Sequence, residues 1–345
     1  MHKRISFVSI AAGRAWAAAL GLTLARGCVA GPAADNPPIS SSRRPLAAAS
    51  CVSGGSSGAG AGGATGAGGG FTVNIPDPPA TTPPNIAGNN IQIMNNCNLT
   101  LYIRTEGGGS PSPTDMTLAA GQKQQISRSS WPGGWIEAHS AMPIGDTNLL
   151  ERVEITVVRG DIWYKLQYLN GIALPIEIYA SGTGPECNKR TGCYVSRQQV
   201  MTDCPDGLLV GQACLAPGVY CADAANQAKP VCHALDSQIA ACAASSACGA
   251  PAGLTSKQAY DCDKFFGTSY KWCAAINRGM LDSPDSTDSS LFYKKAPYND
   301  FSAWVHSFCH TWAFPYDDYN GATADDTMHT CRTATGASVT FCPNG

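Results

Sequence analysis

The sequence carries little charge for its length and no excess of either sign. Of its 345 residues 14% are charged, and 23 basic residues against 25 acidic ones leave a formal net charge of −2. Proteins that bind nucleic acid through its phosphates carry a clustered excess of lysine and arginine. The composition therefore gives no reason to expect a nucleic-acid partner.

Long apolar runs are also missing, because no stretch of eighteen apolar residues, the length that a transmembrane helix needs, occurs in the chain. At the N-terminus, His2, Lys3 and Arg4 precede a shorter apolar run from Ala15 to Ala25. A positive start followed by an apolar run too short to span a bilayer is typical of a signal peptide. We therefore predict an export signal over residues 1–27, and a secreted or cell-surface protein.

The residues around Cys28 leave two routes for removal of this signal. Leu24-Ala25-Arg26-Gly27-Cys28 is similar to a bacterial lipoprotein processing site, in which the cysteine carries the lipid, but Arg26 stands where a small residue is usual. Lipidation of Cys28 and ordinary cleavage nearby both stay open. A membrane is expected as a partner only through such a lipid anchor.

Residues 28–85 lack the side chains that a core needs. Between Ser53 and Gly70 every residue is Gly, Ser, Ala or Thr, and ten of the eighteen are Gly. Such a segment cannot bury enough apolar surface to offset the entropy lost on ordering. Five prolines over 76–84 then favour a stiffer, extended stretch. We predict a disordered tether, or a disordered propeptide if Cys28 carries no lipid.

From residue 91 onward the pattern changes to short segments in which apolar and polar residues alternate. This period of two is typical of strands with one buried face, and Gly- and Pro-rich turns separate the segments. The positions expected to face the core are Ile91, Ile93, Leu99, Leu101, Ile103, Val153, Ile155, Val157, Ile162, Tyr164, Leu166 and Tyr168. We predict a mainly β protein, an antiparallel β-sandwich formed by residues 86–203 and 291–345.

Residues 204–290 differ in kind from the segments on either side. They combine short helical patterns, such as the one over 270–280, with few strand signals. A segment with so few residues that can be buried is not stable without cross-links. We therefore predict a disulfide-rich, partly helical inserted domain. Its eight cysteines are Cys204, Cys214, Cys221, Cys232, Cys242, Cys248, Cys262 and Cys273.

The number of cysteines favours disulfides over metal ligands. Cys28 and Cys51 lie in the signal and tether, which leaves fourteen of the sixteen, an even number, within 97–342. An even count in an exported chain indicates bridges.

Zinc is the competing interpretation, because His306, Cys309 and His310 lie close together and Cys262 and Cys273 could add ligands. However, no C-x-x-C pair occurs in the chain. We expect structural disulfides, and no metal or other cofactor.

The carboxyl-terminal part of the chain resembles the thaumatin-like family. The segments that carry the resemblance are Phe308-Cys309, Phe314-Pro315-Tyr316-Asp317-Asp318, Cys331 and Phe341-Cys342-Pro343, together with Tyr168 to Ile176, which looks like the family's V-D-G-F-N-x-P-x segment. The likeness runs from Asn96 to Pro343. It extends to the related laminaripentaose-producing β-1,3-glucanases.

This resemblance implies part of a disulfide framework. The implied pairs are Cys97–Cys342, Cys187–Cys331 and Cys193–Cys309. The eight cysteines from 204 to 273 would pair among themselves, and the resemblance does not say how.

The resemblance also implies a cleft between sandwich and insert that binds or cuts β-1,3-glucan. Glu154, in Val153-Glu154-Ile155-Thr156, matches the family's glutamate, and strand alternation independently turns it away from the core. Lys165 stands where thaumatin-like proteins usually have an aspartate. Asn170 stands where both groups have one, and Thr311 occupies another position that is often acidic.

The missing carboxylates bear directly on hydrolysis, which normally needs two carboxyl groups. Asn170 cannot take a proton from water, although it can hydrogen-bond a sugar hydroxyl. Lys165 beside Glu154 favours the ionised carboxylate, the wrong direction for a general acid. Glu154 could therefore be a paired surface glutamate, a sugar contact or a catalytic acid. Asp161, Glu137 and Glu151 are near in sequence and could supply another carboxylate.

Two further sets of residues allow two interpretations each. Trp163 lies on the polar side of its strand, where its indole could stack on a pyranose ring or pack against the insert. The same two interpretations, stacking on a sugar or packing against the insert, apply to Trp131 and Trp135. Asp317 and Asp318 are expected to close their own turn rather than to take part in catalysis.

We therefore expect a monomer that binds a β-glucan-type polysaccharide through Glu154, Trp163, Lys165 and Asn170. One alternative is an endo-β-1,3-glucanase, with Glu154 as general acid and a second carboxylate that the sequence does not identify. The other is a disulfide scaffold that binds or inhibits a protein.

Overall fold

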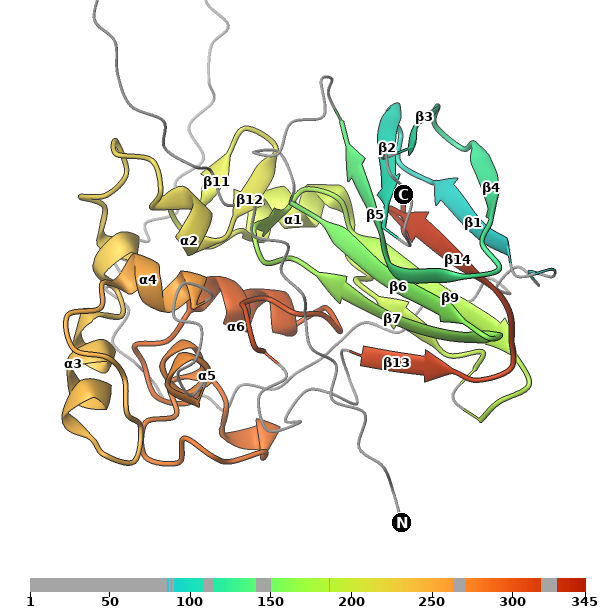
Figure 1. Ribbon diagram of the computed structural model, residues 1–345. Helices are drawn as coiled ribbons and strands as arrows, with labels where there is room; N and C mark the ends of the chain where they lie inside the picture. The colour runs from blue at the N-terminus through green and yellow to red at the C-terminus, as the bar shows by residue number, and fades with distance from the viewer. Residues whose placement is uncertain are drawn as a thin grey trace, which may run out of the picture. The chain divides into compact units, whose positions relative to one another are not determined.

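The computed structural model describes residues 86, 88, 90–107, 114–140, 150–185, 187–262, 271–317 and 328–345 (Figure 1). The predicted signal peptide and tether, with Cys28 and Cys51, lie outside these residues and stay predictions. Within the described ranges, no helix has both the length and the apolar character needed to cross a membrane.

Two large sheets form the β part of the fold. The first has five strands in the order β10 (Arg190–Gly192), β9 (Ile176–Gly182), β14 (Ala334–Phe341), β1 (Asn90–Asn95) and β4 (Lys123–Ser127). The second has six in the order β13 (Met328–Cys331), β7 (Asp161–Gln167), β6 (Arg152–Val158), β5 (Trp131–His139), β2 (Leu101–Glu106) and β3 (Thr114–Leu118). The predicted mainly β fold is confirmed.

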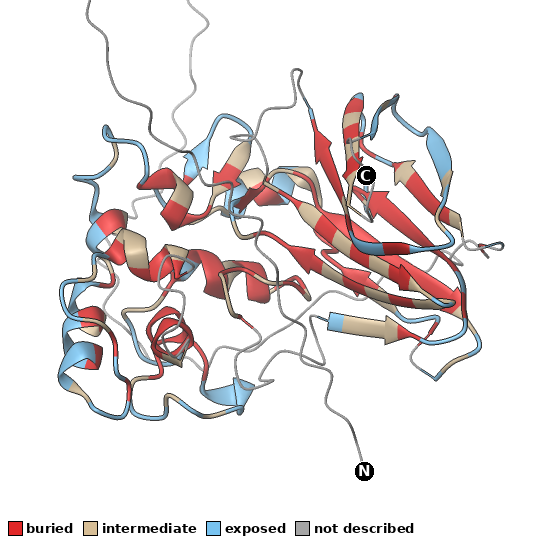
Figure 2. Ribbon diagram, viewed as in Figure 1, coloured by how far each residue is buried: buried red, intermediate tan, exposed pale blue. Residues whose placement is uncertain are grey.

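The core lies between these two sheets. Buried and half-buried residues alternate along β6 and β7, as Figure 2 shows, because successive side chains of a strand point to opposite faces. Ile91, Ile93, Val153, Ile155 and Val157 all join the same buried cluster, as their spacing predicted. The opposite face of β6 and β7 is left for polar side chains.

The five-stranded sheet is mixed, which differs from the purely antiparallel sandwich that was predicted. β1 runs parallel to β14, in a register that pairs Asn90 with Gly336 and Asn95 with Phe341. Cys97 and Cys342 follow the carboxyl ends of these two strands and are bonded to each other. Because this disulfide joins the carboxyl-terminal ends of two neighbouring strands, the two strands run parallel.

The helices lie mainly in the inserted part. They are α1 (Arg197–Asp203), α2 (Pro217–Tyr220), α3 (Asp236–Ala244), α4 (Ser256–Asp261), α5 (Lys271–Arg278) and α6 (Asp300–His306), with short 3-10 turns η2 (Pro230–His233) and η3 (Ser289–Leu291). Trp272 and Ile276 of α5 anchor a second buried cluster with α3 and α4. The α4 helix begins with a capping box between Thr255 and Gln258.

Contacts cross the predicted boundary between sandwich and insert. A small third sheet has the order β11 (Leu209–Val210), β12 (Ala213–Leu215) and β8 (Gly171–Ile172), and its last pair joins the two parts. Phe301 of α6 belongs to the sandwich core, and Phe314 belongs to the cluster of the insert. The domain limits at 204 and 290 stay a prediction.

Seven disulfides are present among the described residues. Cys97–Cys342, Cys187–Cys331 and Cys193–Cys309 pair as the resemblance implied. The other eight cysteines pair consecutively along the chain, as Cys204–Cys214, Cys221–Cys232, Cys242–Cys248 and Cys262–Cys273. Cys309, Cys262 and Cys273 are thus bonded to sulfur, and none of them offers the thiolate that the zinc interpretation required.

Candidate active site on the polar face of the six-stranded sheet

Strand pairing places Glu154 at the centre of a row of side chains. Glu154 of β6 lies opposite Lys165 of β7 and opposite Trp135 of β5. Trp135 in turn lies opposite Glu106 of β2, and Lys165 opposite Met328 of β13. Residues paired across adjacent strands project from the same face of a sheet, so these five share the face that points away from the core.

Both oxygens of the Glu154 carboxylate have a donor. The Lys165 ammonium lies 3.0 Å from Oε2, and the Gln167 side-chain amide donates to Oε1 at 2.8 Å. The side chain of Glu154 is 38% exposed and that of Lys165 is 16% exposed, so the pair is open to solvent mainly at the carboxylate. A cation and an amide donor thus hold the carboxylate in place on this face.

Trp312 belongs to this site although no pattern in the sequence indicated it. Its amide donates to the carbonyl of Leu166 at 3.1 Å, and its carbonyl accepts from the amide of Tyr168 at 2.8 Å. These bonds fix residue 312 against the edge of β7, where the Lys165 ammonium lies 3.6 Å from the centre of the indole ring. Lys165 is therefore held between a carboxylate and an aromatic face.

A second ion pair lies beside the first. Glu137 of β5 faces Arg152 of β6, whose Nε and Nη2 lie 2.8 and 2.6 Å from Glu137 Oε1. The Arg152 guanidinium also lies 4.9 Å from the centre of the Trp135 ring. Burial raises the pKa of Glu137, and Arg152 opposes that effect. With only 1% of its surface exposed, Glu137 is covered by its partner rather than presented to a ligand.

The other predicted contact residues fall partly on this face. Trp163 of β7 is half-buried and lies opposite Thr156 of β6 and Thr330 of β13, on the same side as Lys165. Asn170 is exposed in the turn between β7 and β8, where its carbonyl accepts from the amide of Ala216 at 3.0 Å. The sheet thus brings Glu154, Lys165 and Trp163 together, while Asn170 lies past the end of β7.

The remaining carboxylates considered from the sequence point elsewhere. Asp161, at the first position of β7, accepts from the amide of Thr333 at 3.1 Å. Glu151 is buried and accepts from the amides of Ala173 and Leu174. Burial raises the pKa of Glu151 to about 8, against the effect of those two donors. Neither residue is part of the row around Glu154.

Asp317, which was expected to close its own turn, is buried inside the protein. It accepts from the amide of Ala313 at 2.9 Å, and it pairs with Arg278 at 3.1 Å and with His306 Nε2 at 2.8 Å. Burial alone would raise the pKa of Asp317, but the charges of its two partners lower it. Tyr293 bonds the other ring nitrogen of His306 at 2.7 Å, and Asp318 lies outside the described residues.

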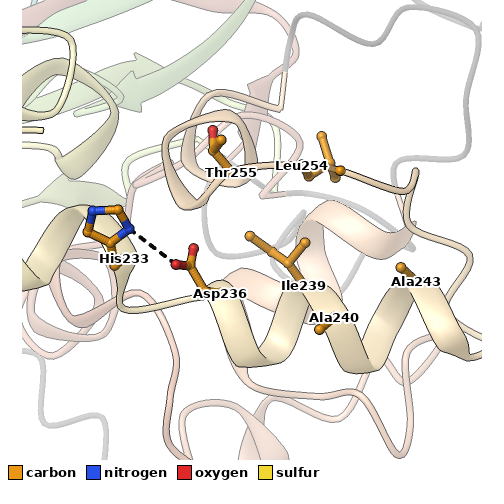
Figure 3. A pocket seen from close by; sticks show the side chains of 8 residues that line it. His233, Asp236, Ile239, Ala240, Ala243, Leu254 and Thr255 are labelled. Carbon is orange, nitrogen blue, oxygen red and sulfur yellow. Dashed lines mark hydrogen bonds and ion pairs between the residues drawn. The ribbon is translucent and has the colours of Figure 1, made fainter.

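A pocket of about 460 Å³ lies in the inserted part (Figure 3). Ile239 and Leu254 give it an apolar wall, and His233 and Asp236 pair with each other at 3.2 Å beside it. Its lining shares no residue with the row around Glu154. It is a feature of α3 and the residues before α4, separate from the polar face of the sheet.

Several solved proteins that superpose on this chain are described as β-1,3-glucanases. The sequence model of glycoside hydrolase family 64, described as β-1,3-glucanase, matches residues 225–342. The β-1,3-glucanase domain from Clostridium beijerinckii superposes with a TM-score of 0.54, at 14% identity, over 75% of this chain and 100% of that domain. This chain has the fold of those glucanases.

Two other solved glucanases give the same result. A laminaripentaose-producing β-1,3-glucanase in complex with laminaritetraose matches at a TM-score of 0.52 and 12% identity, over 74% of this chain and 98% of that one. The enzyme of that type from Paenibacillus barengoltzii matches at 0.52 and 13%, over 77% of this chain and 76% of that one.

The comparisons separate the two halves of the predicted resemblance. A thaumatin-like xylanase inhibitor matches 29% of this chain at a TM-score of 0.24. The family model and the solved glucanase structures support the relationship to the glucanases. No curated protein matches the sequence.

Proposed function

We propose that this protein is a β-1,3-glucanase and that its substrate binds on the polar face around Glu154. The observation that carries the proposal is the match to glucanases, because it covers all of the Clostridium beijerinckii domain and most of this chain. It places hydrolysis ahead of the simple binding that the sequence favoured. Seven disulfides also favour action in an oxidising compartment, after export.

The side chains around Glu154 suit a sugar polymer. Trp135, Trp163 and Trp312 are half-buried residues on or beside the face that carries the carboxylate. Indole rings give a pyranose an apolar surface to lie on, while carboxylate and amide groups accept and donate at its hydroxyls. The face therefore combines the apolar and polar contacts that a glucan chain requires.

Glu154 supplies one of the two carboxyl groups that hydrolysis needs. Lys165 and Gln167 orient Glu154 as a hydrogen-bond acceptor, which suits a base that accepts a proton from water better than an acid that donates one. The catalytic acid predicted at Glu154 therefore becomes a base in this proposal.

The test is release of reducing ends from soluble β-1,3-glucan by the full chain with its disulfides formed. We expect release by the wild type and a loss of at least about 100-fold in Glu154→Gln, the usual size of a general-base effect. Asp236→Asn, in the exposed His233 pair of the insert, is the matched control and should hydrolyse normally. Absence of release by the wild type would refute the proposal.

The second candidate is recognition of β-1,3-glucan without hydrolysis. The observation in its favour is that Asn170 and Lys165 stand where acidic residues are expected, and that Lys165 already pairs with Glu154. Laminarihexaose that bound by calorimetry and stayed intact would select this candidate over the enzyme.

A further inference from the structure

Gln167, the amide partner of Glu154, is itself covered by the protein. Its side chain lies on the same face of β7 as Lys165, two residues along the strand, and only 7% of the residue is exposed. A residue so covered offers almost no surface to a sugar chain. The side chain of Glu154, by contrast, is 38% exposed. Gln167 therefore contacts the carboxylate from the protein side, while the carboxylate stays open to substrate and water.

The backbone of Gln167 is paired on both sides. On one side Gln167 lies opposite Arg152 of β6. On the other side it forms a parallel bridge with Trp312, whose amide and carbonyl bond the residues before and after Gln167. A side chain that extends from a strand paired in this way is placed more precisely than one on a loop. The amide of Gln167 is thus presented to Glu154 from a fixed point.

Arg152, the residue opposite Gln167, is turned away from Glu154. Its guanidinium bonds Glu137 and lies against the ring of Trp135. Gln167 reaches diagonally across the two strands instead, with 2.8 Å between its Nε2 and Glu154 Oε1, and diagonal neighbours in a sheet are within reach of long side chains. Each oxygen of Glu154 thus has its own donor, an amide on Oε1 and the Lys165 ammonium on Oε2.

Two donors on two oxygens fix both the position and the plane of the carboxylate. A glutamate side chain is flexible, and a base acts efficiently only when it is held in the geometry of the reaction. With one donor alone, the carboxylate could still rotate about the remaining bond. Glutamine supplies the second donor without adding a charge beside Lys165.

We propose that Gln167 is a positioning residue for the reaction, and that its amide fixes the orientation in which Glu154 meets the attacking water. This inference rests on the proposed glucanase function and adds to it a residue that does not touch the substrate. Because Gln167 acts through Glu154, its loss should lower the rate of the chemical step and leave the binding of glucan unchanged.

The first test removes the donor in the full chain with its disulfides formed. Methionine has nearly the length of glutamine and cannot donate a hydrogen bond, so Gln167→Met should lower kcat on laminarin by about 10-fold, the effect of one lost hydrogen bond. KM for laminarin and Kd for laminarihexaose should equal those of the wild type. Gln125→Met, the same change at an exposed position of β4 in the other large sheet, is the matched control and should hydrolyse normally.

The second test uses Gln167→Glu, which keeps the shape of the side chain and replaces its amide by a carboxyl group. While this group and Glu154 share a proton, residue 167 can still donate to Glu154, and once both have lost it they repel each other. The rate of this variant relative to the wild type should therefore fall as the pH rises, to a loss of about 10-fold or more. A side chain that only fills space would give a ratio that does not change with pH.

Three results would overturn the proposal while leaving the glucanase function intact. Gln167→Met with the kcat of the wild type removes Gln167 from the reaction. A weaker affinity of Gln167→Met for laminarihexaose makes Gln167 a binding residue. A rate ratio for Gln167→Glu that is constant with pH makes its role structural. No hydrolysis by the wild type would instead refute the glucanase function itself, and the role of Gln167 would fall with it.

Discussion

The buried carboxyl group of Glu151 should make the stability of the protein depend on pH. Glu151 is 3% exposed, and burial raises its pKa from 4.5 to about 8. Between these values the folded protein holds a proton on Glu151 that the unfolded chain has lost. The stabilisation from this proton is complete below pH 4.5 and is lost as the pH rises through 8.

The size of this effect follows from the two pKa values. The rise from 4.5 to about 8 corresponds to ~5 kcal/mol of unfolding free energy at 1.36 kcal/mol per pKa unit. Glu151→Gln keeps an oxygen that can accept from the amides of Ala173 and Leu174, and it cannot ionise. The stability of the variant relative to the wild type should therefore rise by ~5 kcal/mol between pH 4.5 and pH 8.5.

Guanidinium denaturation of the oxidised proteins at these two pH values measures the difference. If the wild type and Glu151→Gln respond equally to pH, the reasoning is wrong. The two backbone donors would then keep Glu151 ionised at neutral pH, since hydrogen bonds to a carboxylate lower its pKa as burial raises it.

Three further predictions concern the core and the site. Asp317→Asn should lower the unfolding free energy by about 3–5 kcal/mol because it leaves Arg278 buried without a counter-ion, and the difference from the wild type should shrink below pH 3.8 as Asp317 is protonated. Replacing Cys97 and Cys342 by serine opens a loop of 245 residues and should cost about 4–5 kcal/mol, measured by the midpoint of chemical denaturation. Trp312→Ala should weaken laminarihexaose binding by about 10-fold in calorimetry without changing the denaturation midpoint, and equal affinity would exclude Trp312 from the site.

The sequence predicted the strands whose apolar and polar residues alternate, because that alternation matches the two faces of a strand. Ile91 and Ile93, and Val153 and Ile155, are buried because each pair is separated by one residue along a regular strand. The same rule turned Glu154 outward. β3 and β4 escaped prediction because their residues are mostly exposed on both faces, so no alternation marks them.

The two tryptophans of β5 show why alternation fails locally. Trp131 and Trp135 are four residues apart and should share a face, yet Trp131 is in the core and Trp135 lies opposite Glu154. The pairing of β5 with β6 shifts between Trp131 and Gly134. An extra residue at such a bulge exchanges the two faces, and Gly133, with a φ of +60°, is the residue type that a bulge there favours.

The residues that surround Glu154 could not be predicted from local sequence patterns alone. Gln167 reaches Glu154 across the β6–β7 hairpin, Trp312 through hydrogen bonds to β7 from far along the chain, and Glu106 through the pairing of β2 with β5. Such register is set by the whole sheet. The four short disulfides of the insert were likewise open until the structure paired them.

The parallel pair of β1 and β14 sets the order in which this protein can be made. β14 lies between β9 and β1, and it follows every other strand of the fold in the sequence. During synthesis β1 emerges early and has no partner on that side until the whole insert has been added. Cys97 must keep its thiol until Cys342 appears 245 residues later, while four cysteine pairs of the insert become available for local bonding. The five-stranded sheet is therefore among the last parts of the molecule to be completed.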